Sequence, residues 1–147
     1  MTTKQDIVTA VADVLTAVPL PVLEYPADIA DIAETTPVVI VEEMRGRVNT
    51  TNYLASGCVT HNWTVEVMAV VAWHTGDVFY PSDSSAANDL LANDYEQTII
   101  TAIIAATLPD AVKNTELSSV VGGFLREDNV AIWGVQVLIP VSQIIEF

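Results

Sequence analysis

The chain has 147 residues, of which 51% are hydrophobic, and it is long enough to bury its core as one domain over residues 1–147. Its single cysteine, Cys58, excludes an internal disulfide framework. Nineteen acids oppose five bases, and the resulting net charge of −14 disfavours direct binding to nucleic-acid phosphates. No apolar run approaches the roughly 20 residues of a membrane helix, and the first residues do not resemble a signal peptide. We therefore expect no membrane partner.

The first predicted element is an amphipathic helix over residues 3–18. Thr2 or Thr3 is placed to cap it, and Asp6 lies in the first turn, where the helix dipole favours an acid. Pro19 ends the predicted helix and begins a connection that contains several prolines. The apolar residues at helical spacing, which predict the buried face, are Ile7, Val8, Val11, Leu15 and Val18.

The first predicted strand covers Val38–Met44, and the segment 45–62 follows it. Part of this segment, Val48–Ala55, either forms a hairpin with Val38–Met44 around Gly46 or belongs to one long loop. Exposed loops often carry function, so we expect the segment to contact a partner. The candidate interaction residues are Arg45, Arg47, Asn49, Asn52, Tyr53 and His61.

Residues 63–74 alternate with a period of two, which is the side-chain period of a β-strand. At about 3.3 Å per residue this strand spans roughly 35–40 Å. Such a long apolar face requires a cover, and the helix-patterned segment near Ala86–Leu108 is the strongest candidate. The residues expected to share the apolar face are Trp63, Val65, Val67, Ala69, Val71 and Trp73.

The second predicted helix begins after several possible N-caps at 82–85 and ends at Leu108-Pro109. Its apolar side chains lie near one helix face at Ala87, Leu91, Tyr95, Ile99, Ala102 or Ile103, and Ala106.

Two further strands are predicted near the end of the chain. The first covers residues 116–121, and Gly122-Gly123 is expected to break it. The second covers Val130–Ile139, in which Gly134 predicts a bulge or a close backbone approach. Pro140 cannot donate a ladder hydrogen bond, so we expect an interruption or a sheet edge there. The whole pattern predicts an α+β fold, with a mostly antiparallel β-sheet of about four to five strands packed with two α-helices.

No residue pattern in the sequence calls for catalysis. Cys58 and His61 have zinc-like spacing, but the second ligand pair is missing, and no orienting group is placed beside them. Gly122-Gly123 lacks the spacing and the lysine of a phosphate-binding loop, and no Gly-x-Ser-x-Gly elbow is present. We expect no catalytic residue, metal or cofactor, and no enzyme. A small acidic enzyme or ligand-binding domain stays open as an alternative, which a deep pocket with convergent polar groups would favour.

The order and spacing of these features resemble a known family. A helix leads through Tyr25-Pro26 into a short apolar strand at 37–41, and a long strand then begins at Trp63. An Asp/Ser/Ala linker precedes a helix that ends at Thr107-Leu108-Pro109, and the chain closes on a VQVLIPV strand. This layout is similar to the small tail-terminator, or tail-completion, proteins of long-tailed bacteriophages.

The resemblance implies a structural virion protein of the tail and neck, assembled in the host cytoplasm. Such proteins form a homo-oligomeric ring, typically a hexamer, that caps the tail tube protein and docks to the head–tail connector proteins. DNA passes through the lumen without specific binding, and an acidic lumen would let it slide. Other phage neck proteins, the head-completion and stopper proteins, have comparable sizes and are the alternative.

Overall fold

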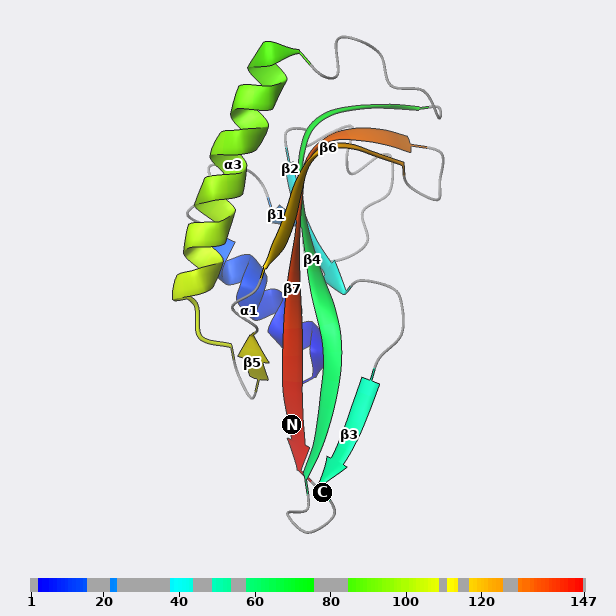
Figure 1. Cartoon of the computed structure of the whole chain (residues 1–147), viewed down its shortest axis with the longest axis vertical. Helices are drawn as coiled ribbons and strands as arrows, with labels where there is room; N and C mark the ends of the chain where they lie inside the picture. The colour runs from blue at the N-terminus through cyan, green and yellow to red at the C-terminus, as the bar shows by residue number, and fades with distance from the viewer. Residues whose placement is uncertain are drawn as a thin grey trace.

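The computed structural model describes residues 3–15, 22–23, 38–43, 49–53, 58–75, 85–108, 111–113, 117–125 and 130–146. These residues form two helices and one sheet of seven strands (Figure 1). The elements in chain order are α1 (Lys4–Val14), β1 (Val22–Leu23), β2 (Val38–Glu43), β3 (Asn49–Tyr53), β4 (Cys58–Thr75), α3 (Ala86–Ala105), β5 (Ala111–Lys113), β6 (Ser118–Leu125) and β7 (Val130–Glu146).

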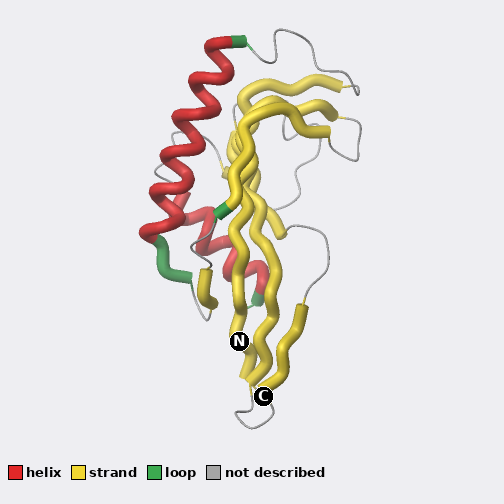
Figure 2. Tube along the Cα trace, viewed as in Figure 1, coloured by secondary structure: helices red, strands yellow, loops and turns green. Residues whose placement is uncertain are grey.

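The predicted α+β fold is confirmed. Four strands have six residues or more, and these strands (β2, β4, β7 and β6) lie side by side in that order, each antiparallel to its neighbour. Three shorter strands, β1, β3 and β5, add to the sheet, and only β1 is parallel to its partner, β2. Both helices lie on the same side of the sheet (Figure 2).

The sheet is built around β4 and β7, which pair along almost their whole length, from Cys58 opposite Glu146 to Thr75 opposite Val130. β4 has 18 residues and begins five residues before the expected Trp63. Residues 58–62, for which the sequence allows a loop, therefore belong to the central strand.

The predicted hairpin between Val48–Ala55 and Val38–Met44 is wrong in its pairing. A strand does form, at Asn49–Tyr53, but it pairs with β4, from Asn49 opposite Asn62 to Tyr53 opposite Cys58. β2 pairs with β4 only between residues 65 and 70, so the first residues of β4 have a free edge that β3 occupies. The connection between β3 and β4 is also short, which favours a hairpin.

A bend in the sheet lies where three observations coincide. The register of β4 against β7 shifts between Val70 and Ala72, which marks a β-bulge. Gly134 lies opposite Val70 and Gly122 lies opposite Gly134, so two glycines flank the bulge in one row. Near this row β4, β6 and β7 turn away from the helices (Figure 1). A Cβ atom on Gly134 would fall on the carbonyl oxygen of Ala69, which confirms the predicted close approach.

The bulge also changes which face a side chain occupies, because one extra residue reverses the alternation of a strand. The expectation that Trp63 and Trp73 share an apolar face is therefore wrong. Trp63 is buried in the core under the helices, whereas Trp73 packs with Val38 and Ile132 in a second cluster on the opposite face.

The predicted break at Gly122-Gly123 is wrong, and at Pro140 the structure shows, among the described strands, a local edge without an interruption, which is the second outcome predicted there. β6 continues through Gly122-Gly123, and β7 continues through Pro140 to Glu146. β6 pairs with β7 only up to Leu138, and β5 pairs with it only from Val141 onward. Pro140 therefore lies in a gap between two neighbouring strands, where a missing N–H group costs no ladder hydrogen bond on that side.

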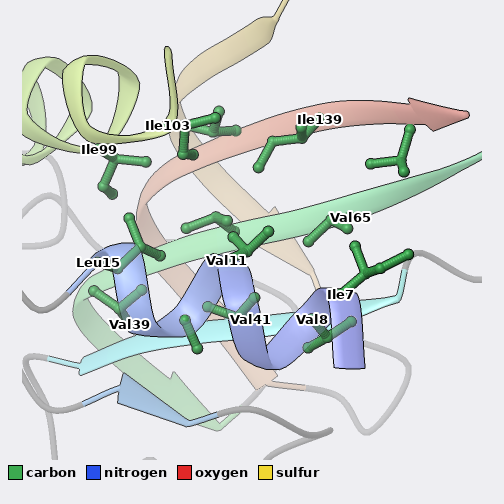
Figure 3. Packing of buried hydrophobic residues seen from close by; sticks show 14 of the residues in the cluster. Ile7, Val8, Val11, Leu15, Val39, Val41, Val65, Ile99, Ile103 and Ile139 are labelled. Carbon is green, nitrogen blue, oxygen red and sulfur yellow. The ribbon is translucent and has the colours of Figure 1, made fainter. Parts of the chain in front are cut away.

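The main core lies between the sheet and the two helices (Figure 3). From the sheet it takes the helix-facing valines and isoleucines of β2, β4 and β7, among them Val41, Val65 and Ile139. Burial of this apolar area at roughly 25 cal/mol per Å² is the main stabilising contribution to the fold. From the helices and the segment after α3 the core takes Ile7, Val8, Val11, Ala12, Leu15, Ile99, Ile103 and Leu108.

The first helix begins as the sequence predicts. Thr3 is the N-cap, its hydroxyl accepts a hydrogen bond from the backbone N–H of Asp6 at 3.2 Å, and the Asp6 carboxylate accepts one from the Thr3 N–H at 2.7 Å. The regular helix ends at Val14, and the remaining residues of the predicted helix, 16–18, lie outside the described residues.

This capping box gives a testable pH dependence. The Thr3 backbone and side-chain hydrogen bonds lower the pKa of Asp6. The stabilisation by the ionised carboxylate is then fully present above the unfolded pKa, near 4, and disappears as the pH falls through the lower folded pKa. Thr3→Ala is expected to cost about 1 kcal/mol at pH 7 in urea unfolding. It should raise the Asp6 pKa in an NMR titration only partly, because the larger cause, the backbone hydrogen bond, remains. An unchanged Asp6 pKa would contradict this account.

The second helix is 20 residues long, or about 30 Å. Ser85 caps it by accepting a hydrogen bond from the Asn88 N–H. The helix ends at Ala105, three residues before the predicted end, and the next residue has an extended backbone. Its buried residues are Ala92, Ile99 and Ile103, whereas Ala87 and Leu91 of the predicted apolar face are exposed.

Candidate functional site

The structure describes four of the six predicted interaction residues. Arg45 and Arg47 lie outside the described residues. Asn49, Asn52 and Tyr53 belong to β3 and pair with Asn62, Val59 and Cys58 of β4. His61 is half-buried and lies opposite Thr50 of β3 and Gln143 of β7. The four residues therefore lie in paired strands at one end of the sheet.

The helix-free face of the sheet carries a small polar cluster. Gln136 donates a hydrogen bond from Nε2 to Glu66 Oε2 at 2.8 Å, and Ser142 donates one from Oγ to Asn62 Oδ1 at 2.7 Å. Glu42 lies directly opposite Glu66 on the neighbouring strand, and all these side chains are half-buried. Like charges in a directly opposed pair repel each other, and the hydrogen bond from the Gln136 amide offsets part of this repulsion at Glu66.

Trp63 and Trp133 have different environments. Trp63 is 5% exposed, its Nε1 atom has no hydrogen-bond partner among the described residues, and the Lys4 ammonium lies 5.4 Å from its ring centroid. Trp133 donates from Nε1 to Asp89 Oδ1 at 3.1 Å. This bond attaches the first turn of α3 to β7 beside the bend.

The described residues form no cluster of metal ligands. No group of three or more His, Cys, Asp or Glu side chains among them is placed to hold a metal ion. Within the same part of the chain, no helix is long and apolar enough to cross a membrane.

The surface that sequence reasoning missed is the outer edge of β6. This strand has eight residues, and among the described strands it pairs only with β7. Ser118, Ser119 and Val120 are exposed, and Val120 is 53% exposed. One signal for this edge is present in the sequence. Residues 117–125 contain no charged residue and no proline, in a chain with 19 acids.

The outer side of α3 is a second exposed apolar feature. Leu90 and Ile104 are 68% and 59% exposed. They lie two heptads apart on the side opposite the buried Ile99, and Gln97, which is exposed, lies midway between them. Polar residues therefore separate the two apolar side chains, so they do not form one continuous patch.

In comparisons with known proteins, no family model matches the sequence of this chain, and no curated protein matches it.

Proposed function

We propose that this chain is a structural virion protein of a long-tailed bacteriophage, a tail terminator that forms a hexameric ring. The ring caps the tail tube, stops its polymerisation and joins it to the head connector. The proposal starts from the order of elements that the sequence shares in outline with the tail-terminator proteins.

One structural observation supports a ring subunit above a solitary domain. Among the described residues, the sheet has strand edges without a partner at both of its sides, β5 and β6 on one and β1 and β3 on the other. Both helices pack on one face and so leave these edges uncovered among the described residues. A subunit with two different open sides can contact one neighbour at each side, which is the requirement for a closed ring.

The charge of the chain fits the same role. A net charge of −14 repels nucleic-acid phosphates, so DNA would pass through such a ring without binding to it. Acids that line a lumen would thus prevent the passing DNA from adhering to the ring.

The first experiment is the solution mass by light scattering, with negative-stain images of the same sample. We expect a closed ring of about 95 kDa, six times the 15.8 kDa of the chain. Added to polymerising tail tubes, the ring should stop their growth at substoichiometric amounts. An unrelated acidic protein of similar size is the control and should leave tube length unchanged.

The tube assay also separates the two neck functions. A ring that leaves tube growth unchanged but binds the portal side of the head connector would overturn the terminator and establish a stopper or head-completion protein. Retention of DNA by the ring at physiological salt would contradict the role assigned to the charge.

A further inference from the structure

The outer edge of β6 is an acceptor for another strand. Its outward backbone N–H and C=O groups have no strand partner among the described residues. Soluble proteins usually protect such edges with charged side chains, proline or very short strands. β6 has eight residues, and none of them is charged or a proline. The edge is therefore suited to pairing rather than protected against it.

The charge of the chain restricts a contact between two copies to strand edges that are neutral. Two copies that each carry a charge of −14 repel each other wherever their acids approach. β6 has no charge, and the strand at the opposite side of the sheet, β1, consists of Val22 and Leu23. These two edges can therefore meet without opposing acids within the paired strands.

The strand register places these two edges at the same height. Val121 of β6 lies opposite Val135, and the same row continues across the sheet through Ala69 and Val39 to Val22 of β1. A rotation about an axis along the strands would then bring one edge to the other with no axial shift. A closed ring needs this condition, since any shift would produce a helical filament.

The strand directions and the position of β3 also favour a contact between β6 of one copy and β1 of another. β1 is parallel to β2, and three successive antiparallel pairings lead from β2 to β6, so β6 and β1 run in opposite directions. The other open strand, β3, pairs with β4 at residues 58–62, a level about nine residues, or roughly 30 Å, from the centre of β6. β3 is thus too far along the strand axis to meet β6 in a closed ring.

We infer that β6 of one copy pairs antiparallel with β1 of the next copy, with Val121 opposite Val22, so that the sheet continues around the ring. This inference rests on the proposed function for the ring itself and adds the surface by which the ring closes.

The first test places a charge on the edge. Val120→Lys adds a charge to an exposed edge position, where it should oppose strand pairing without disturbing the core. Gln97→Lys is the matched control, with the same charge change on the side of α3 that points away from the sheet. Light scattering should give rings for the wild type and the control. The concentration at which Val120→Lys assembles should rise at least about tenfold.

A second variant, Ser119→Lys, keeps the test valid if Val120→Lys misfolds. Ser119 is exposed on the opposite face of β6, and circular dichroism reports whether each variant keeps its fold. Folded Lys variants that still form wild-type rings would overturn the β6 edge and leave the ring itself intact. A wild type that stays monomeric at the highest attainable concentration would also overturn the edge inference, while the tube assay would still decide the proposed function.

A cross-linking experiment tests the partner of β6. In a Cys58→Ser background, Val22→Cys and Val121→Cys proteins are mixed and oxidised mildly. Head-to-tail pairing predicts disulfide-linked dimers only in the mixture, and a ladder of larger species when both cysteines are in one chain. Dimers from Val121→Cys alone would show β6 paired with β6 across a two-fold axis and would overturn the inference.

Discussion

Replacing Gly134 with alanine is expected to destabilise the fold by at least about 3 kcal/mol, the upper part of the usual range for overpacking. The added methyl group would fall on the carbonyl oxygen of Ala69, which is backbone and cannot move aside as a flexible side chain can. The two central strands would have to separate at the bulge, where the sheet bends. Urea unfolding monitored by circular dichroism measures the loss directly.

Gly122 provides the matched control, because it lies directly opposite Gly134 in the same row. A Cβ atom there meets nothing within 4 Å. Gly122→Ala should therefore be neutral or stabilising by about 0.4–1 kcal/mol, since alanine restricts the unfolded chain. Equal effects at the two glycines would show that the close approach to Ala69 does not exist in solution.

Ile103→Ala is expected to cost about 2–5 kcal/mol, which is the range for removing a buried isoleucine side chain. Ile103 is 2% exposed and belongs to the core between α3 and the sheet. The neighbouring Ile104 is 59% exposed, and its replacement with alanine should change the free energy of unfolding by no more than about 0.5 kcal/mol.

This pair tests the orientation of α3, since the two isoleucines differ only in the direction they face. A large loss at Ile104 and a small one at Ile103 would mean that the helix is rotated about its axis. Both proteins should also be examined by light scattering. We expect Ile104→Ala to keep the wild-type mass, because the inferred contact between copies uses β6 and β1 instead of α3.

The elements of the fold were largely predictable because their signals are local. The capping pair Thr3 and Asp6 and the apolar spacing from Ile7 are contained within one or two helical turns. The alternation after Trp63 identifies a strand in the same way. By contrast, the glycine pair of β6 predicted a break that does not occur, and the sequence left open whether Pro140 of β7 marks an interruption or an edge. Whether such residues end a strand depends on the strands beside them.

The candidate site was less predictable than the fold. The polar character and loop-like setting of His61 and the β3 residues indicate an exposed loop, whereas the structure places them in paired strands. The open edge of β6 was not identified, because an edge is defined by the absence of a neighbouring strand. The sequence of residues 118–125 alone does not specify which strands will pair with it.

The sequence by itself determined the types of the long helices and strands, the α+β class and the strongly negative net charge, since these follow from side-chain periodicity and composition. Only the tertiary structure decided that β3 pairs with β4, that the bulge moves Trp73 to the face opposite Trp63, and that β6 pairs with β7 alone among the described strands. The physical reason is that strand pairing joins residues far apart in the chain. Each pairing depends on which edges the other strands leave free.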